Sequence, residues 1–521
     1  MFKKITLLLI LLLAAALLLS GCGDTDPAED AAEALSPRHG GVLRNAYYAP
    51  TNLDPAFLGT IPDDHIGRQW SDFLVYIDEE NQPDINRSVA EYWESDDTAK
   101  VWTFKLREGI LFHDGKEMTS IDVKFTFDRL RDPDVGAATV GLYENIEEIT
   151  APDEYTVVFR LAESNVDFLL DLGDYHALIM DADNENFATN WNGTGPFMIE
   201  RYEPEDRIIF TRNPNYWMTD DDGYPLPYLD GLEFIFLSDS SAQVEALRGG
   251  QVDYLLYLPT EFVPLLEEDP DFVVYQKPSN LSYVLRMRSD RAPADDVRVR
   301  QALKAGTDRA AILEAAVGGL GTTGRDTPIG PAYGDFYLDV PEPERDVERA
   351  KELLAEAGYP DGLDIVLTTQ EVSPVPAIAT IWQEQMKEIG VNVEIQLVPS
   401  EVYYGADDMW LEADFAITDW APRPSPQPYL AQAYMCDAPW NESHWCDPEL
   451  DELARAAGSE LDYEERVRLY HEIQEVFIER GPVIIPFFVN NLWGAHVSLK
   501  NLQPTSAVGT SLDLRTVYFE Q

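Results

Sequence analysis

Residues 346–398, DVERAKELLAEAGYPDGLDIVLTTQEVSPVPAIATIWQEQMKEIGVNVEIQLV, decide the fold class of this chain. Residues 346–357 carry apolar side chains at helical spacing, and a short strand, residues 363–367, follows them. A second helix, from about residue 377 to residue 389, leads into a second strand at residues 391–398. Helices and strands that alternate in this way predict an α/β domain with a largely parallel sheet.

The N-terminal half of the chain also mixes strands with helices. Residues 101–106 and 155–161 alternate apolar and polar side chains, which predicts two half-buried strands. Residues 120–130 place apolar side chains three and four apart, behind an N-cap candidate at Thr119 or Ser120. The whole chain is therefore predicted to be of the α/β class.

The composition is strongly acidic. The 521 residues include 94 Asp and Glu but only 38 Lys and Arg, so the net charge is −56. Such a charge excludes nucleic-acid binding, which needs a basic surface. We attribute the acidity to a saline medium, where salt screens the self-repulsion and carboxylates keep the protein dissolved. The length and the 45% hydrophobic content predict two or three domains.

The N-terminus has the pattern of a secretory signal peptide. Lys3 and Lys4 precede an apolar run from residue 5 to residue 19, which is shorter than the roughly 20 residues that cross a bilayer. No second long apolar run follows, so the body of the chain is not expected to cross the membrane. An ordinary cleaved signal with a chance cysteine is one interpretation of this segment.

The run ends in Leu19-Ser20-Gly21-Cys22, which resembles the lipobox of bacterial lipoproteins. The resemblance implies that residues 1–21 are removed and that Cys22 carries the lipid that anchors the exported protein at the cell membrane. Residues 22–37, rich in Ala, Asp, Glu and Pro, would then form a flexible tether.

The other two cysteines are Cys436 and Cys446. Export places them in an oxidising compartment, which favours a local disulfide. The alternative is a metal site that also uses His444 and Asp447, but structural zinc sites usually pair two cysteines only two to four residues apart. We therefore predict a disulfide and no metal.

A set of short segments follows one another along the chain. They are GGVLR (40–44), LDP (53–55), VAEYWE (89–94), WTFKLREG (102–109), FHDGK (112–116), GTGPF (193–197), GGQVD (249–253), DVRVRQAL (296–303) and AEAGY (355–359). In this order they resemble the family 5 extracellular solute-binding proteins, the receptors of peptide, oligopeptide and nickel ABC importers.

The resemblance implies a two-lobed periplasmic-binding-protein fold of the larger type, with an extra domain inserted in the first lobe. Lobe I would comprise residues 38–75, 190–287 and 490–521, the inserted domain residues 76–189, and lobe II residues 288–489. In this family the lobes close over a small-molecule or peptide ligand, and the ABC permease subunits recognise the closed form. The protein would act as a monomer, without a cofactor and without chemistry on the ligand.

The resemblance also names candidate ligand-binding residues. The loop Gly59-Thr60-Ile61 would pair with the ligand backbone as a strand does. In the second lobe, the family has a Trp-x-x-Asp segment whose tryptophan packs on the ligand and whose aspartate holds a peptide α-ammonium. This chain keeps Trp420 but has Arg423 in place of the aspartate.

This departure changes the expected ligand. Arginine suits a carboxylate, a phosphate or a sugar hydroxyl rather than an ammonium group. Asp419 is a substitute for the lost charge, although in a strand it faces the side opposite to Trp420. The alternative interpretation of Arg423 is a structural partner of a nearby carboxylate. Tyr143 of the inserted domain completes the set of candidate ligand-binding residues.

The cargo itself stays open between a peptide, an oligosaccharide and an acidic small molecule. Aromatic residues are frequent in the candidate cleft region, and either a sugar or a peptide would stack on them. Besides Trp420 they include Tyr403, Tyr404, Trp410 and Tyr429.

An exported hydrolase is the alternative from a different class of proteins. It would require a nucleophile or paired carboxylates with shifted pKa values in the cleft. The pair His113-Asp114 lies at a glycine turn, without a serine or cysteine nucleophile context. A turn held by side-chain hydrogen bonds is the better interpretation, and we expect no enzymatic activity.

Overall fold

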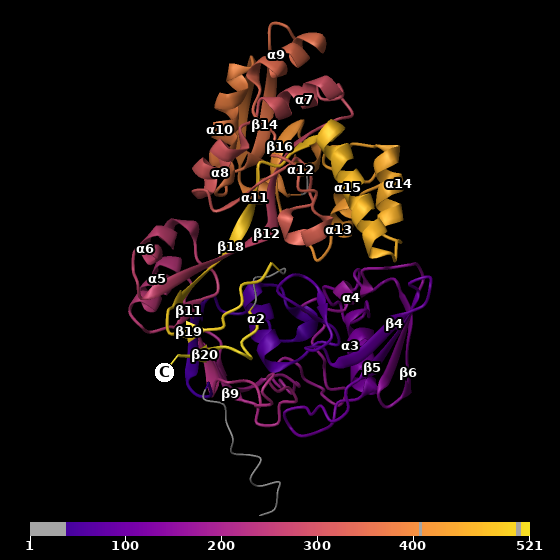
Figure 1. The fold of residues 1–521 in the computed structure, drawn as a ribbon, viewed down its shortest axis with the longest axis vertical. Helices are drawn as coiled ribbons and strands as arrows, with labels where there is room; N and C mark the ends of the chain where they lie inside the picture. Colours follow the sequence, from indigo (N-terminus) through magenta and orange to yellow (C-terminus); the bar gives the residue numbers. More distant parts are fainter. Residues whose placement is uncertain (1–37, 406–408, 507–511, 521) are drawn as a thin grey trace, which may run out of the picture.

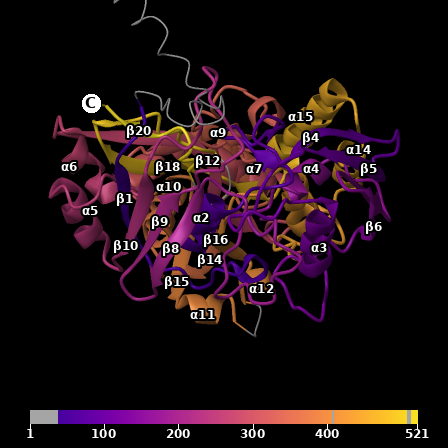
Figure 2. The same ribbon diagram turned by 90° about the horizontal axis from the view of Figure 1, so that it is seen from below.

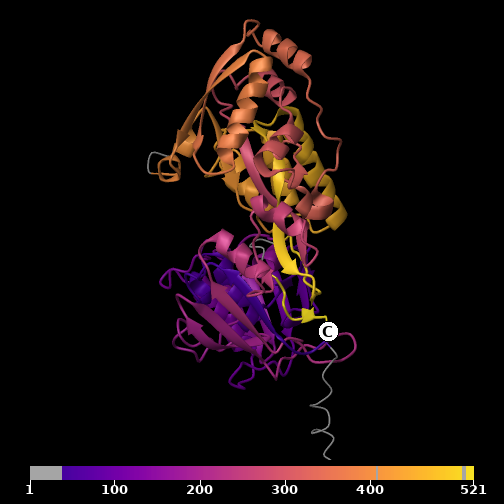
Figure 3. The same ribbon diagram turned by 90° about the vertical axis from the view of Figure 1, so that its left-hand side faces the viewer.

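Two bodies joined by two long strands make up the described part of the chain (Figure 1). The computed structural model describes residues 38–405, 409–506 and 512–520. The linking strands are β12 (Phe272–Met287) and β18 (Phe487–His496), which run from the lower body into the upper one (Figure 3). The expected signal peptide, the tether and Cys22 lie outside the described residues.

One twelve-stranded sheet extends through both bodies of the described chain. Its strand order is β15 (Val391–Val398), β14 (Leu363–Gln370), β16 (Phe415–Trp420), β12, β18, β11 (Tyr254–Leu255), β1 (Val42–Tyr47), β10 (Gly231–Phe236), β9 (Arg207–Arg212) and β8 (Phe197–Glu203). Two short strands, β13 (Gly321–Thr323) and β17 (Val483–Ile484), pair with β18 and β12.

The prediction of a largely parallel sheet was wrong for the sheet as a whole. β14 lies parallel to β15 and β16, and β1 lies parallel to β10 and β11. β12, however, is antiparallel to both β16 and β18, and the β8, β9 and β10 pairs are antiparallel too. The strand–helix–strand pattern enforces parallel pairing only where a helix returns the chain, whereas β12 and β18 carry the chain up and back down between the bodies.

The two linking strands change partners along their length. Residues 272–278 of β12 pair with β18, and residues 282–287 pair with β16, with a register shift between Pro278 and Ser282. The strand that pairs with β12 therefore changes between residues 278 and 282. The predicted second segment of lobe I ends later, at residue 287. The division into lobes remains a prediction.

Helices cover both faces of the upper part of the sheet (Figure 1). On one face, α7 (Val297–Ala305), α8 (Arg309–Val317), α9 (Val347–Glu356) and α10 (Val375–Glu388) share a core with Phe415 and Ile417 of β16. On the other face, α14 (Pro448–Ala457) and α15 (Tyr463–Arg480) share a core with Trp420. Among the helices of the described ranges, none is long and apolar enough to cross a membrane.

A separate four-stranded sheet occupies one side of the lower body, seen from below in Figure 2. Its order is β4 (Ala90–Ser95), β5 (Val101–Leu106), β7 (Thr156–Leu161) and β6 (Ile146–Asp153). α3 (Ser120–Leu130) packs against it, and Thr119 is its N-cap. The backbone N–H of Thr119 donates to Asp122 at 2.9 Å, which fixes the start of the helix.

Asp171 is a partly buried carboxyl group whose titration should affect the stability of the fold. It ends α4 (Phe168–Asp171), and burial raises the pKa of its carboxyl to about 8. The carboxylates of Asp167 and Asp174 contribute to this rise in pKa, and a hydrogen bond from Asn165 opposes it. Between about pH 4 and pH 8 the native protein keeps a proton on Asp171 that the unfolded chain releases.

The free energy of unfolding should therefore fall as the pH rises through this window, by at most about 1.4 kcal/mol per pH unit. We expect Asp171→Asn, which cannot ionise, to remove this slope in urea unfolding at mildly acidic and neutral pH. Asp134→Asn, at an exposed position of the same body, should retain it. A slope unchanged by Asp171→Asn would contradict the raised pKa.

Candidate functional site

The loop of Gly59, Thr60 and Ile61 lies at the start of α2 (Ile61–Trp70) and is organised by Asp63. The Asp63 carboxylate, with no exposed surface, accepts the backbone N–H groups of Gly59 at 2.8 Å, Thr60 at 3.1 Å and Thr51 at 2.6 Å. These N–H groups already have a partner. The Thr60 carbonyl also has a partner, since it accepts the Asp64 backbone N–H at 3.2 Å, so the loop is poorly suited to a two-sided strand ladder with an extended ligand.

Trp420 ends β16 and is held by a buried acidic residue. Its indole Nε1 donates to Glu442 Oε1 at 2.9 Å, and its side chain is only 6% exposed. Glu442 Oε2 accepts from Thr418 Oγ1 at 2.5 Å and from Arg286 Nε at 3.2 Å. Only a small part of the Trp420 ring is therefore exposed for contact with a ligand. Its hydrogen bond is already used within the protein.

Glu442 is a functional residue that the sequence did not reveal. It is 5% exposed, and burial raises the pKa of its carboxyl while Arg286 opposes this shift. It lies between Cys436 and Cys446, 22 residues after Trp420. Nothing in its neighbouring sequence marks it as the anchor of a distant tryptophan.

A chain of touching aromatic rings surrounds Trp420. Successive ring centroids lie 4.9 to 6.3 Å apart along the series Tyr403, Tyr404, Trp410, Trp440, Trp420, Tyr429 and Tyr333. Tyr403 and Tyr429 are buried, whereas Tyr404 and Trp440 are 41% and 40% exposed. The exposed rings form a stacking surface, which we call the aromatic wall. Trp440 was not among the residues predicted from the sequence.

Arg423 lies beside this wall, over two buried rings, and has no carboxylate partner among the described residues. Its guanidinium carbon is 5.8 Å from the ring centre of Trp420 and 5.9 Å from that of Tyr429. Its Nη1 group donates to the carbonyl oxygens of Ala421 and Pro422, both at 3.3 Å. No carboxylate of the described residues forms an ion pair with Arg423. The structure therefore offers no carboxylate for the alternative interpretation, in which Arg423 is the structural partner of a nearby acidic residue.

Two tyrosines hold the backbone that carries Arg423. The Tyr333 hydroxyl donates to the Arg423 carbonyl at 2.9 Å, and the Tyr429 hydroxyl donates to the Ala421 carbonyl at 2.8 Å. Both tyrosines are buried. The segment 421–426 is therefore a fixed element of the upper body, and Arg423 projects from a rigid support.

Asp419 faces away from Trp420, as the strand period predicts. Its carboxylate accepts from the Tyr404 hydroxyl at 2.7 Å and from Gln370 Nε2 at 2.5 Å. It is an exposed residue of β16, and its charge adds to the effect of burial, which raises the pKa of Tyr283 on the neighbouring strand. Asp419 thus lies on the face of the strand opposite to Trp420, where Tyr404 and Gln370 occupy its carboxylate.

Tyr143 does not lie in a ligand site, so this prediction was wrong. Its side chain is 1% exposed, packs edge-on against Phe127 and donates its hydroxyl to the Asp171 carbonyl at 2.9 Å. It belongs to the core of the body that carries α3. A tyrosine that follows a turn has the same local sequence whether its ring faces a cleft or a core, so the sequence could not separate the two.

Cys436 and Cys446 form a disulfide, with their sulfur atoms 2.09 Å apart. His444 lies beside Arg288, whose Nη2 is 3.1 Å from His444 Nδ1, and Asp447 caps α14. Within the described ranges, no group of three or more His, Cys, Asp or Glu side chains is arranged to hold a metal. His113 contacts the Gly195 carbonyl through Nε2 at 3.1 Å, within a turn rather than beside a nucleophile.

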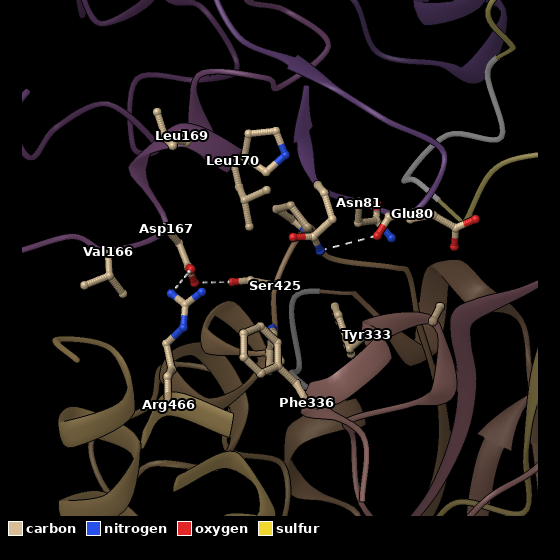
Figure 4. Close-up of a pocket in the computed structure, with 15 residues that line it drawn as sticks. Glu80, Asn81, Val166, Asp167, Leu169, Leu170, Tyr333, Phe336, Ser425 and Arg466 are labelled. Carbon is tan, nitrogen blue, oxygen red and sulfur yellow. Dashed lines mark hydrogen bonds and ion pairs between the residues drawn. The ribbon is translucent and has the colours of Figure 1, made fainter. Parts of the chain in front are cut away.

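The bodies meet beside the Arg423 segment. Asp167 of the lower body accepts from Ser425 Oγ at 2.6 Å and from Arg466 Nη1 at 2.8 Å (Figure 4). Pro424 and Arg68 of α2 line one small pocket together. The segment that carries Arg423 and the helix that begins at Ile61 therefore approach each other across the gap between the bodies.

The two bodies are linked by β12 and β18. The lower body carries the loop before α2, and the upper body carries the aromatic wall and Arg423. This arrangement defines a two-lobed solute-binding protein. The family model described as "Bacterial extracellular solute-binding proteins, family 5 Middle" matches residues 84–442. The chain belongs to this family, as the ordered segments predicted. The family consists of binding proteins rather than enzymes.

Relatives cover most of the chain. The di/tripeptide-binding protein 1 of Pseudomonas aeruginosa (strain UCBPP-PA14) is 28% identical over 473 residues, 84% of this chain and 86% of that protein. The dipeptide-binding protein of Escherichia coli (strain K12) is 28% identical over 435 residues, 76% of this chain and 79% of that protein. The structure of HbpA2 from Haemophilus parasuis has a TM-score of 0.84 at 23% identity, covering 92% of this chain and 100% of that one.

Proposed function

We propose that this protein is the receptor of an ABC importer, which captures a peptide or a similar small oligomeric solute between its lobes and delivers it to the permease. The observation that carries the proposal is Arg423, a cation without a carboxylate partner in the described chain, which lies over the rings of Trp420 and Tyr429 and beside the aromatic wall. The predicted lobe boundaries and a monomeric state are part of the proposal.

The chemistry of the site limits the cargo. A guanidinium beside Trp420 repels a free α-ammonium and binds a carboxylate or several acceptor oxygens. Two relatives are named for the binding of dipeptides or tripeptides, which supports a peptide whose amine end is blocked or directed elsewhere. An oligosaccharide or an acidic small molecule is the second candidate, because Tyr404 and Trp440 would stack on a sugar ring as well as on a side chain.

Native mass spectrometry of the freshly purified protein is the experiment that tests this function. A receptor should carry a co-purified ligand that leaves on denaturation, and it should return added peptides unchanged after incubation. Consumption of the peptides with release of fragments would instead support the exported hydrolase. A protein that neither retains nor binds any small solute would contradict the proposal.

We also propose that the exported protein is anchored by a lipid on Cys22, which lies outside the described residues. When the full chain is expressed in a bacterial host, it should partition into detergent, and intact mass analysis should find a lipid at Cys22. Cys22→Ala should move it into the aqueous phase, whereas Thr25→Ala, in the adjoining tether, should not. An aqueous wild-type protein without added mass would contradict the anchor.

The acidity supports a saline habitat, which predicts how stability depends on salt. Raising KCl from about 0.1 M to about 1 M shortens the Debye length from about 10 Å to about 3 Å and so weakens repulsion among carboxylates. The free energy of unfolding, measured in urea, should therefore rise with salt in this range. A protein most stable at the lowest salt would contradict adaptation to a saline medium.

A further inference from the structure

Asp167 of the lower body makes its side-chain contacts across the gap between the bodies. It is the N-cap residue of α4, but its carboxylate does not cap that helix. Its Oδ1 accepts from Arg466 Nη1 of α15 at 2.8 Å, and its Oδ2 accepts from Ser425 Oγ at 2.6 Å (Figure 4). Both carboxylate oxygens are therefore bound by the upper body.

These contacts are shielded from water. Asp167 and Ser425 are buried, and the side chain of Arg466 is only 15% exposed. The guanidinium carbon of Arg466 also lies 4.9 Å from the ring centre of Phe336, which covers one face of the charge. Dissolved salt screens a largely buried pair of charges much less than an exposed one, so this pair can hold two surfaces together even in a saline medium.

The contacts lie at the edge of the gap that is farther from the linking strands. In two perpendicular views, α4 and α15 lie on the same side of the molecule, away from β12 and β18 (Figures 1 and 2). A rotation of one body about the linking strands moves this edge more than the parts beside the hinge. Opening of the gap must therefore break the contacts of Asp167.

The surfaces beside these contacts are not close-packed. A pocket that encloses about 570 Å³ of space between atoms adjoins them, lined by Leu169 and Leu170 from the lower body and by Tyr333 and Phe336 from the upper body. Because these side chains leave space between the bodies, apolar packing contributes less here than in a protein core. The polar contacts of Asp167 therefore account for a large share of the attraction at this edge.

We infer that Asp167, Ser425 and Arg466 form a latch, which joins the predicted inserted domain (residues 76–189) to the upper body and biases the cargo-free protein toward the closed form. The inference rests on the proposed function, since closure matters only to a receptor that binds between its bodies. The apparent affinity for the cargo rises in proportion to the share of the protein that is already closed. Asp167 is thus a positioning residue, which also holds the segment after Arg423 through Ser425.

Small-angle X-ray scattering of the cargo-free protein tests the latch. Asp167→Asn keeps the size of the side chain but removes the charge that pairs with Arg466, so the radius of gyration should rise as the gap opens. Arg466→Gln removes the same pair from the upper body and should give the same rise. Asp134→Asn, at an exposed position of the lower body, is the matched control and should leave the scattering curve unchanged.

A charge exchange distinguishes the latch from a role of Asp167 in the local fold of α4. Asp167→Arg alone places two like charges against each other and should open the gap further than Asp167→Asn does. Adding Arg466→Asp restores an ion pair of the opposite sense, so the radius of gyration should return toward that of the wild type. A purely local defect in α4 would not be repaired by a change in α15.

Calorimetry with the co-purified cargo measures the consequence for capture. Asp167→Asn should lower the affinity about three- to tenfold, as expected when the closed share of the cargo-free protein falls by that factor. Asp134→Asn should keep the affinity of the wild type. Affinity in Asp167→Asn and Arg466→Gln equal to that of the wild type would overturn the latch.

The outcomes separate the latch from the proposed function. Scattering curves of Asp167→Asn and Arg466→Gln that match the wild type would overturn the latch, whatever the protein binds. Opening that the charge exchange does not reverse would overturn it as well. A wild type that binds no small solute would instead contradict the proposed function, and scattering, which needs no cargo, would still decide the latch. If Asp167→Asn fails to fold, as judged by circular dichroism, Arg466→Gln decides the test.

Discussion

Replacing Arg423 by alanine lowers the affinity for the co-purified cargo about ten- to a hundredfold, since a charge-assisted hydrogen bond contributes about 1.5–3 kcal/mol. The reason is the absence of an ion-pair partner for Arg423 in the described chain, together with its position over Trp420 and Tyr429. Calorimetry with the cargo identified by mass spectrometry is the measurement.

Three further variants make this test specific. Arg423→Lys keeps the charge but loses the forked geometry, so it should weaken binding less than alanine does. Arg423→Asp should bind the native cargo worst of all and should admit peptides with a free α-amine. Arg325→Ala is the matched control, because Arg325 is another half-buried arginine that donates to backbone carbonyls. Unchanged affinity in both Arg423→Ala and Arg423→Asp, with an intact circular dichroism spectrum, would make Arg423 structural and return free-amine peptides to contention.

Replacing Glu442 by alanine should lower the free energy of unfolding by about 3–5 kcal/mol, because the buried charge of Arg286 would lose its carboxylate. Arg286 is 1% exposed, and its other contacts go to the backbone carbonyls of Ala413 and Trp410. The indole N–H of Trp420 would lose its acceptor as well. The cargo affinity should fall in parallel, since Glu442 fixes the ring around which the aromatic wall is built.

Urea unfolding followed by near-ultraviolet circular dichroism measures this loss of stability. Glu442→Gln keeps an acceptor for the Trp420 indole and should be less harmful than alanine. Glu475→Ala, at an exposed position of α15, should stay within about 0.5 kcal/mol of the wild type. A loss of less than about 1 kcal/mol in Glu442→Ala would mean that water or a rearranged side chain compensates Arg286.

The same contacts explain why Arg423, and not Trp420, is the position for a binding test. The sequence analysis treated Trp420 as a ligand-stacking residue. The structure shows its ring embedded in the core with α14 and α15. Trp420→Ala would open a cavity and cost about 3–5 kcal/mol of stability, which would obscure any effect on the cargo.

Local patterns predicted the regular elements closely. The strand at residues 391–398 coincides with β15, the strand at residues 101–106 coincides with β5, and the helix at residues 120–130 coincides with α3 behind Thr119. These features depend on side-chain periodicity and on caps, which involve residues within four positions of one another. The ordered segments likewise predicted the family.

Only some residues of the candidate site could be predicted from the sequence. Arg423 stood out because it replaces an aspartate that the family resemblance leads one to expect, and the strand period placed Asp419 on the opposite face. Trp440 gave no signal, since an exposed aromatic residue is ordinary where it stands. Its importance comes from the rings of Trp410 and Trp420 that it contacts.

By itself, the sequence determined the elements, their class and the family, because helix and strand formation follow from neighbouring residues. Only the tertiary structure decided which strands pair antiparallel between the bodies, that Tyr143 is buried and that Glu442 anchors Trp420. It also decided that Asp167 meets Ser425 and Arg466 across 258 and 299 positions of the chain. The partner of a polar side chain depends on which distant elements pack together, and no local period or cap records that choice.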